Sequence, residues 1–246
     1  MTNAHEISAW GQSDIGLKRP NNEDAYLIDN RHGFYVVADG MGGEAAGEIA
    51  SGIFVETADQ LKGGNARRSP EEAVEFIQQV FGLANGSILE HVQDHPQCSG
   101  MGCTAELLVV HSEGFLLGHV GDSRTYRLRN GIFQQLTKDH SLVQQQIDDG
   151  LITPMESQRH PLQNVILRAV GIEEDIAVDM VRGNLKAGDQ LLLCSDGLSD
   201  MLSDETIADA LHTAAPPQSK VEVLIEQAKA SGGRDNITVV LADILP

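Results

Sequence analysis

The sequence predicts an α+β fold in which antiparallel β-sheets are covered by helices on their outer faces. Its expected elements begin with strands and two helices and continue with several strands, two helices and a last strand, which differs from the regular βαβ alternation of a parallel sheet. Asn130-Gly131 between two short strands is a strong hairpin signal. Residues 34–38 and 190–194 are almost continuously apolar, as expected for strands buried on both faces.

The N-terminal part of the chain is expected to hold three strands and a first helix. Residues 7–12 alternate well enough for a strand, and residues 25–28 and 34–38 form a hairpin around residues 30–33. A helix over residues 45–61 follows, because its apolar positions fall on one face. These positions are Ala46, Ile49, Ala50, Ile53, Phe54, Thr57 and Leu61.

A second helix carries its own start signal. Ser69 suits the N-cap, Pro70 suits the first helical position, and Glu72 completes a capping box. Apolar residues at helical spacing then form a stripe that we expect to be buried. The stripe consists of Val74, Ile77, Val80, Phe81, Ala84 and Ile88.

The middle of the chain is predicted to be mainly strands joined by tight turns. A short helix over residues 141–148 interrupts them, and residues 150–163, with two prolines and mixed polarity, are expected to form an irregular flap. The expected strands are residues 104–110, 114–120, 125–128, 132–136, 176–181 and 190–194.

Two helices and a strand are expected to close the chain. The first helix begins near Ser203, with acidic residues in its positively polarised first turn. The second is expected to begin at Ser219, which forms a capping box with Glu222. Residues 236–242 form the final strand.

Length and composition favour one domain and exclude some partners. No linker divides the 246 residues, so we expect a single domain over residues 1–246, with a flap subdomain at about residues 140–170. The net charge of −19 argues against a nucleic-acid partner, because phosphate binding needs a basic surface. The polar start and the lack of any long apolar segment predict neither a leader nor membrane association. A monomer is the expected state.

The three cysteines have an odd number and no metal-ligand spacing. Cys103 and Cys194 lie before and inside apolar strands, so we expect buried thiols there. Cys98 completes the set. Free thiols fit a reducing cytoplasm.

Three aspartates stand at the ends of predicted strands that are far apart in the sequence. Asp39 follows the apolar strand 34–38, Asp196 follows 190–194, and Asp235 precedes the last strand. A lone Asp-Gly pair is more often a turn than a ligand. Three such carboxylates together suggest one oxygen-ligand metal site, which suits Mg²⁺ or Mn²⁺, whereas zinc favours histidine and cysteine.

Six short motifs resemble, in this order, those of the metal-dependent protein Ser/Thr phosphatases of type 2C. The resemblance is to the compact bacterial members and covers nearly the whole chain. It implies a four-layer αββα sandwich, with two central antiparallel sheets between pairs of helices. The motifs are Arg19-Pro20-Asn21-Asn22-Glu23-Asp24, Asp39-Gly40-Met41-Gly42-Gly43, Met101-Gly102-Cys103-Thr104-Ala105, Gly121-Asp122-Ser123-Arg124, Ser195-Asp196-Gly197 and Gly233-Arg234-Asp235-Asn236.

The resemblance also implies a binuclear Mn²⁺ or Mg²⁺ centre. In this family the residue matching Asp39 bridges both ions, and those matching Asp196 and Asp235 complete the first. The carbonyl group of the residue matching Gly40 reaches the second ion, and the residue matching Asp24 holds a water of that ion.

The resemblance implies a further weak metal site and a phosphate-binding residue. The residue matching Asp122 binds a third, weaker ion in bacterial members. Arg19 matches the phosphate-binding arginine, whose planar guanidinium suits two phosphate oxygens. Asp122 alone is equally a turn residue, and Arg124 is expected to pair with a nearby carboxylate.

The proton donor to the leaving group is left open. Eukaryotic relatives carry a histidine where this chain has Met41, and methionine has no proton to donate. His160 in the flap is a candidate general acid or substrate contact, because histidine titrates near neutral pH. The alternatives are an exposed loop role for His160, with a metal-bound water or bulk solvent as the acid. His140 is expected to be structural, at a helix entry.

The implied activity is hydrolysis of phosphoserine and phosphothreonine in proteins by direct attack of a metal-bridging hydroxide. The implied partners are phosphorylated proteins, among them substrates of a Ser/Thr kinase or the kinase itself. A cysteine-based mechanism is not expected, since no cysteine begins the Cys-x5-Arg loop that it requires.

Three other functions fit the sequence less well. Residues 40–45 satisfy a Gly-x-Gly-x-x-Ala dinucleotide pattern, but no strand follows the helix to carry a ribose-binding acid. A catalytically silent binding module would show lost ligands, and none is lost. A two-metal nuclease conflicts with the acidic charge.

Overall fold

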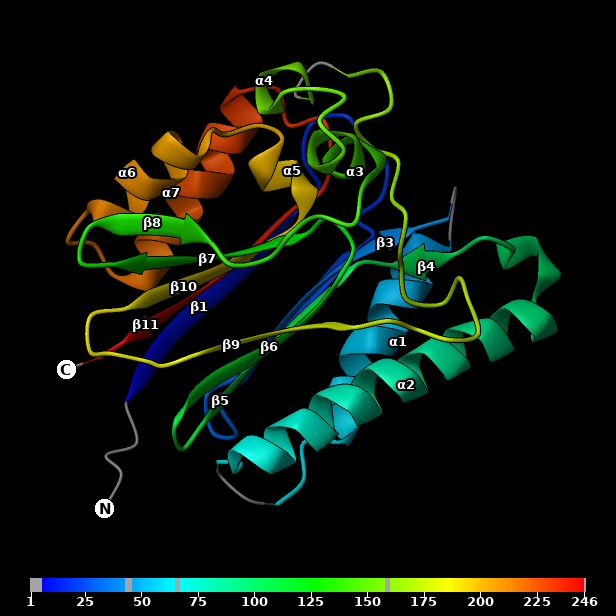
Figure 1. Ribbon diagram of the computed structural model, residues 1–246, viewed down its shortest axis with the longest axis horizontal. Helices are drawn as coiled ribbons and strands as arrows, with labels where there is room; N and C mark the ends of the chain where they lie inside the picture. Colours follow the sequence, from blue (N-terminus) through cyan, green and yellow to red (C-terminus); the bar gives the residue numbers. More distant parts are fainter. Residues whose placement is uncertain (1–5, 43–45, 65–66, 158–159, 246) are drawn as a thin grey trace.

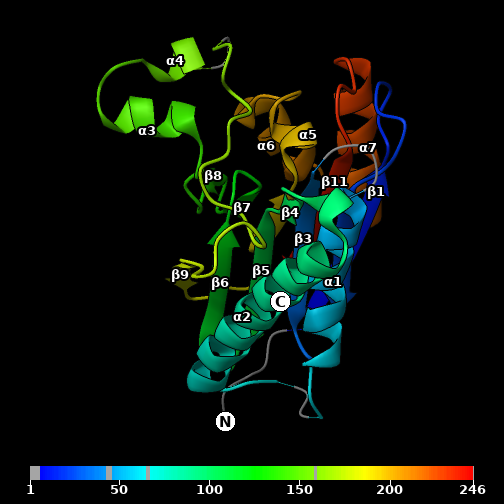
Figure 2. The same ribbon diagram turned by 90° about the vertical axis from the view of Figure 1, so that its right-hand side faces the viewer.

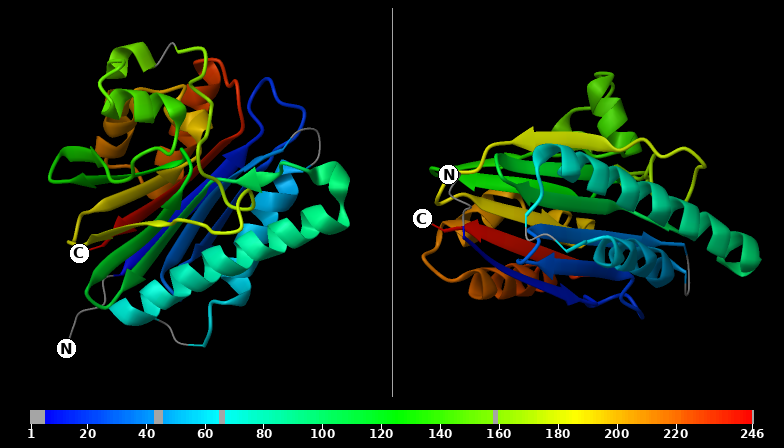
Figure 3. Two further views of the ribbon diagram at one scale, coloured as in Figure 1. Left: turned by 45° about the vertical axis from the view of Figure 1, so that its right-hand side comes forward. Right: turned by 90° about the horizontal axis from the view of Figure 1, so that it is seen from below.

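The computed structural model describes residues 6–42, 46–64, 67–157 and 160–245 (Figure 1). Residues 43–45 of the dinucleotide-like pattern and the flap residue Arg159 lie outside these residues. Two antiparallel sheets lie face to face, and a pair of helices covers the outer face of each (Figures 1 and 3). This arrangement confirms the predicted α+β class and its four layers.

The first sheet joins the two ends of the chain. The last strand lies between the first strand and the strand 190–194, with Ile7 opposite Ile244 and Asp14 opposite Ile237. The strand order is β1 (Ile7–Asp14), β11 (Ile237–Ile244), β10 (Gln190–Cys194), β7 (Arg124–Arg129) and β8 (Ile132–Gln135).

The second sheet contains the remaining strands. Its main path is β2 (Asp24–Asp29), β3 (Phe34–Met41), β5 (Ala105–His111), β6 (Gly114–Val120) and β9 (Asp179–Gly183), and the short β4 (Gly102–Cys103) pairs with β3.

Alternating side chains of β3 show why its sequence is continuously apolar. Tyr35 and Val37 enter the core between the two sheets. Phe34 and Val36 enter the core under the helices, where Phe34 meets Phe76 edge to face at 5.2 Å. Because both faces are buried, no position on this stretch favours a polar side chain until Asp39.

Four long or medium helices form the outer layers. Helices α1 (Gly47–Gln60) and α2 (Pro70–Asp94) cover the second sheet, and α6 (Asp204–His212) and α7 (Pro217–Ala230) cover the first (Figure 1). The capping box at Ser69 is confirmed, as is the N-cap at Ser203. No helix among the residues described has both the length and the apolar character needed to cross a membrane.

The flap stands apart from the sheets (Figures 2 and 3). It carries α3 (Leu142–Asp148) and the short α4 (Pro154–Ser157). Its two ends are held side by side, since the Leu142 amide donates to the Val165 carbonyl at 2.9 Å and the Leu167 amide donates to the His140 carbonyl at 2.7 Å. The flap therefore leaves the body of the protein through a hydrogen-bonded stem.

Three predicted details are wrong. The flap includes the helix α4, which the two prolines concealed. The strand expected at 176–181 is β9, which begins at Asp179, because Ile176 and Val178 pack against the α1–α2 core without strand pairing. The helix expected from Ser219 begins at Pro217, since proline is already shaped for the first helical position.

Two short helices were not predicted. The 3₁₀ helix η1 (Pro96–Cys98) follows α2, and α5 (Asp196–Ser199) follows β10. The Asn130-Gly131 hairpin is confirmed, with φ values of 51° and 78° that suit its tight turn.

Candidate metal centre

Two aspartates face each other across the β2–β3 hairpin. Asp24 begins β2 and lies directly opposite Asp39 near the end of β3. The amide of Asp39 donates to the Thr104 hydroxyl at 3.2 Å, and the Ser195 hydroxyl donates to the Asp24 carboxylate at 2.7 Å. Polar side chains from two other segments thus hold this pair in place.

Three further aspartates reach the same place from other elements. Asp196 starts α5 directly after β10, and Asp122 lies in the turn between β6 and β7. Asp235 precedes β11, where the neighbouring Asn236 bonds the carbonyls of Ile15 and Asn21 and the amide of Glu23. The fold therefore gathers the five predicted acidic residues, since the charges of the other four all raise the pKa of Asp39, in addition to the larger effect of burial.

Burial and mutual repulsion raise the pKa values in this cluster. Burial raises the pKa of Asp39 well above its usual value, and the charges of Asp24, Asp196, Asp122 and Asp235 add to the effect. Burial, followed by the charge of Asp122, does the same to the pKa of Asp196. Burial also raises the pKa of Asp24 to about 6 and that of Asp122 to about 7. Apart from Asp235, which pairs with Arg19, none of these carboxylates forms an ion pair with a residue that the structure describes.

The same carboxylates remain partly reachable by solvent. Asp24, Asp39 and Asp196 each keep some exposed surface, although protein atoms surround their carboxyl groups closely enough to shift their pKa values. The cluster therefore lies deep in the protein without being sealed, as a site for a small ion requires.

Unsatisfied carboxylate oxygens support a metal role. Six buried side-chain oxygens have no hydrogen-bond partner in the described part of the chain, and three belong to this cluster: Oδ1 of Asp24, Asp122 and Asp196. Such groups are costly unless a ligand satisfies them. An all-oxygen donor set of this kind fits Mg²⁺ or Mn²⁺.

Gly40 is tightly enclosed. A Cβ atom at Gly40 would collide with the carbonyl oxygens of Gly47 and Glu23, so only glycine fits at this point. Within the described residues, however, no three His, Cys, Asp or Glu side chains converge closely enough to form a completed coordination shell as they stand. The donor chemistry fits the predicted ions, and the side chains are not yet arranged around one.

Arg19 lies at the mouth of the cluster. Its guanidinium donates to the Asp235 carboxylate at 2.6 Å, and the Arg19 side chain remains about half exposed, at 49%. The sequence predicted Arg19 as a phosphate ligand, and the structure places it beside the aspartates with much of its surface free to meet a substrate.

Asp122 and Arg124 have separate partners. The Asp122 side chain is nearly buried, whereas Arg124 binds the Asp139 carboxylate with both Nε and Nη2, the latter at 2.7 Å. The prediction that Arg124 pairs with a carboxylate is confirmed. Burial raises the pKa of Asp122, and the Arg124 charge opposes this effect only in part, without an ion pair between the two residues.

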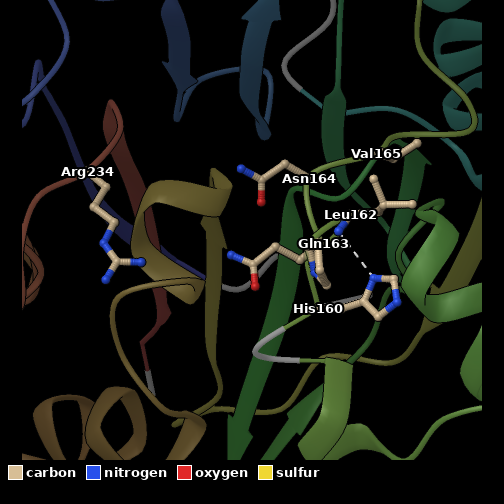
Figure 4. A pocket seen from close by; sticks show the side chains of 7 residues that line it. His160, Leu162, Gln163, Asn164, Val165 and Arg234 are labelled. Atoms are coloured by element: carbon tan, nitrogen blue, oxygen red, sulfur yellow. Dashed lines mark hydrogen bonds between the residues drawn. The ribbon is translucent and has the colours of Figure 1, made fainter.

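His160 lies in a different cavity from the aspartates. A cavity of about 540 Å³ is lined by His160, flap residues 161–165 and Arg234 (Figure 4). A smaller one of about 100 Å³ is lined by Asp196, Asp200, Asp235 and their neighbours. Nδ1 of His160 accepts a hydrogen bond from the Leu162 amide at 3.2 Å, so Nε2 is the ring nitrogen that takes no part in this bond.

Cysteine chemistry has no support in the fold. Cys98, Cys103 and Cys194 are buried and free. Burial raises the pKa values of the Cys103 and Cys194 thiols above their usual range, so neither is a ready thiolate nucleophile. The prediction of buried thiols at these two positions is confirmed.

The sequence of the chain matches a known family over most of its length. The family described as Protein phosphatase 2C matches residues 11–232. The chain belongs to the protein phosphatase 2C family. Its structural relatives are bacterial phosphatases of the same architecture, which agrees with the two sheets and flanking helices described above.

Two relatives and one solved structure illustrate the similarity. Serine/threonine protein phosphatase PstP of Mycobacterium tuberculosis is 40% identical over 238 residues, or 95% of this chain and 44% of PstP, so the chain spans less than half of that relative. Protein phosphatase PhpP of Streptococcus pneumoniae is 37% identical over 94% of this chain and 95% of PhpP. The catalytic domain of PstP, solved with two manganese ions, has a TM-score of 0.85 at 38% identity, covering 98% of this chain and 99% of that one.

Two acidic residues of the site were not among the predicted ligands. Asp200 lines the smaller cavity, and burial raises its pKa. Asp200 follows Asp196 by four residues, so a helix predicted at this point would have placed the two carboxylates on the same face. Burial also raises the pKa of Glu23, whose carbonyl accepts the Gly40 amide at 3.1 Å.

Proposed function

We propose that this chain is a metal-dependent phosphatase that hydrolyses phosphoserine and phosphothreonine in proteins. The observation that carries the proposal is the convergence of five aspartates, from five places in the sequence, beside one half-exposed arginine. Membership of the protein phosphatase 2C family supports the reaction class.

Asp39 would be a ligand shared by the two ions, Asp196 and Asp235 would help to hold the first, and the Gly40 carbonyl would help to hold the second. Asp24 would orient a water of the second ion, and Asp122 with Asp196 would hold a third, weaker one. When bound, Mn²⁺ or Mg²⁺ ions supply hydroxide at neutral pH for direct attack on phosphorus and offset charge on the phosphoryl oxygens. The unsatisfied oxygens of Asp24, Asp122 and Asp196 support this ligand set.

The chain's own residues hold and orient the substrate. Arg19 presents a planar guanidinium to two phosphoryl oxygens, and its bond to Asp235 fixes that guanidinium next to the ligands. Burial raises the pKa values of the Cys103 and Cys194 thiols, which favours attack without a covalent intermediate at either of them. His160 lines the larger cavity rather than the aspartate cavity, which favours contact with the peptide over proton donation to the leaving group.

The proposed substrates are phosphoproteins, as the names of the relatives suggest for those proteins. Proteins phosphorylated by a Ser/Thr kinase, or that kinase itself, fit this substrate class. We propose that the chain acts on them as a monomer.

The test is phosphate release from a phosphothreonine peptide by wild type and Asp39→Asn, with Mn²⁺ and with excess EDTA. We expect release by wild type in Mn²⁺, none in EDTA, and at least about a 100-fold loss in Asp39→Asn, since a central ligand is removed. A folded wild-type protein that releases no phosphate in Mn²⁺ or Mg²⁺ would contradict the proposal and favour a silent binding module.

A further inference from the structure

The larger cavity lies next to the aspartate cavity and shares part of its wall. Gln163, Asn164 and Arg234 line both. If the aspartates and Arg19 hold the phosphoryl group, the peptide that carries it would therefore leave the site past these three residues. This inference rests on the proposed function and concerns the part of the substrate that surrounds the phosphorylated residue.

Among the residues that the structure describes, Arg234 is the one Lys, Arg, Asp or Glu residue that lines this cavity. Apart from Arg234, the described lining consists of His160, Pro161, Leu162, Gln163, Asn164 and Val165. Figure 4 shows the amide groups of Gln163 and Asn164 extending toward the side on which Arg234 lies, with the His160 ring on the opposite side. Amides of this kind donate and accept hydrogen bonds, as a peptide backbone requires.

The guanidinium of Arg234 is not engaged by the protein. Arg234 is exposed and forms neither a hydrogen bond nor an ion pair with any residue that the structure describes. By contrast, Arg19 is bound to Asp235 and Arg124 to Asp139. Arg234 lies near enough to Asp200 for its charge to lower the pKa of that carboxyl, against the larger effect of burial, without pairing with it.

The backbone around Arg234 is fixed on both sides. Asn236 is bound to the carbonyls of Ile15 and Asn21 at 3.0 and 2.8 Å. On the other side, Gly233 has a φ of 48° and donates its amide to the Ala228 carbonyl at 3.1 Å. The side chain of Arg234 lies over Gly232, since Cγ and Nε are 3.8 and 3.9 Å from the place of a Cβ there. The cation is therefore presented from a rigid turn.

We propose that Arg234 is a specificity-determining residue that binds the carboxylate of an acidic residue flanking the phosphorylated residue of the substrate. A guanidinium forms two parallel hydrogen bonds with a carboxylate, and charge-assisted bonds are stronger than neutral ones. The strongly acidic surface otherwise repels such a peptide, because the net charge of the chain is −19. Selection of an acidic flank by this otherwise anionic protein therefore depends on a local cation.

The test uses phosphothreonine peptides that differ only by Asp or Asn at one position, placed in turn at each of the three residues on either side. The measured quantity is the ratio of kcat/KM for the Asp peptide to that for the Asn peptide, in Mn²⁺. Wild type should favour Asp about threefold to fivefold at one position, since an exposed ion pair contributes at most about 1 kcal/mol. Arg234→Gln should bring that ratio to about 1, and Arg234→Glu should bring it below 1.

Arg182→Gln is the matched control, because Arg182 is exposed in a separate groove beside Pro70 and Phe115. It should keep the wild-type ratio. If Arg234→Gln changes kcat/KM equally for every peptide, Arg234 acts on the phosphoryl group or on the site charge, and the inference is overturned. Equal ratios in wild type also overturn it while leaving the proposed function intact, whereas no hydrolysis of any peptide in Mn²⁺ overturns both.

Discussion

Glu106 of β5 and Asp39 of β3 are carboxylates on neighbouring strands. Both are enclosed by protein, but their charged neighbours differ. Glu106 lies opposite Val37, two residues before Asp39. It binds the His119 ring and accepts the Thr125 hydroxyl at 2.6 Å, all within the fully buried space between the sheets. Asp39 instead has four aspartates as its charged neighbours.

The electrostatic consequences differ accordingly. Burial alone would lower the pKa of His119, but the Glu106 charge raises it to about 9, so the pair is held as an ion pair at neutral pH. Burial raises the pKa of Glu106 against the opposite effect of His119. Asp39 has no such partner, and its neighbours add to the effect of burial. The comparison shows that this fold compensates a buried charge where it is structural and leaves it uncompensated where a cation is expected.

The largest expected effect breaks the compensated pair. His119→Leu leaves Glu106 buried without its cation, and we expect the free energy of unfolding to fall by about 3–5 kcal/mol. Urea denaturation at neutral pH measures this. The double variant Glu106→Leu/His119→Leu should recover part of the loss, because no unpaired charge remains. A loss below about 1 kcal/mol in His119→Leu would show that Glu106 needs no compensation.

The next prediction removes the charge but keeps the shape. Glu106→Gln should lower the pKa of His119 from about 9, because burial is then opposed only by the hydrogen bond to the Lys138 carbonyl and the charge of Asp139. In wild type the folded pKa of His119 exceeds its unfolded value, so its contribution to stability is complete below pH 6.5 and is lost as pH rises through 9.

Glu106→Gln should therefore reduce this loss of stability between pH 6.5 and 9. NMR titration of the His119 ring measures the pKa, and urea denaturation at several pH values measures the stability. An unchanged pKa in Glu106→Gln would contradict the role given to Glu106.

A smaller effect is expected at the edge of the uncompensated cluster. Asp200→Asn should raise the Mn²⁺ concentration for half-maximal phosphatase activity by about tenfold, as removal of groups around metal ligands often does. Asp209→Asn, on the exposed side of α6, is the control and should leave that concentration unchanged. Equal Mn²⁺ requirements for all three proteins would remove Asp200 from the site.

The smallest effect on stability is expected at the one ion pair of the cluster. Arg19→Ala should change the free energy of unfolding by less than about 1 kcal/mol, because the Arg19 side chain is 49% exposed. It should nevertheless raise KM for a phosphopeptide about tenfold, since a charge-assisted contact to phosphate is lost. A large loss of stability with an unchanged KM would make the pair structural instead.

The same contrast explains what the sequence could predict. Asp39, Asp196 and Asp235 stand at the ends of apolar strands, so their convergence follows from the strand pattern and the family motifs. Glu106 and His119 carry no such signal, because their pairing depends on the register of β5 and β6. Asp200 was missed because α5 is too short to show helical periodicity.

The cavity beside Arg234 was equally beyond the sequence. Its other wall is the flap segment 160–165, whose place is set by the hydrogen bonds of the flap stem rather than by local preference. The start of β9 was misplaced for a related reason, since Ile176 and Val178 are apolar for contact with the helical layer and not for strand pairing. Local patterns predict elements, whereas tertiary contacts decide which of them pair.

The most direct test of the central claim is thermal unfolding of wild type and Asp39→Asn, each in EDTA and in Mn²⁺. Without metal, Asp39→Asn should be the more stable protein by at least about 1 kcal/mol, because one unfavourable buried charge is removed and each pKa unit corresponds to about 1.4 kcal/mol. With Mn²⁺, wild type should become the more stable of the two, because ion binding to the folded state stabilises it. The order of the two proteins should therefore reverse on adding Mn²⁺. If Asp39→Asn is the less stable protein in EDTA, or if Mn²⁺ stabilises both equally, the aspartates are not an uncompensated cation site.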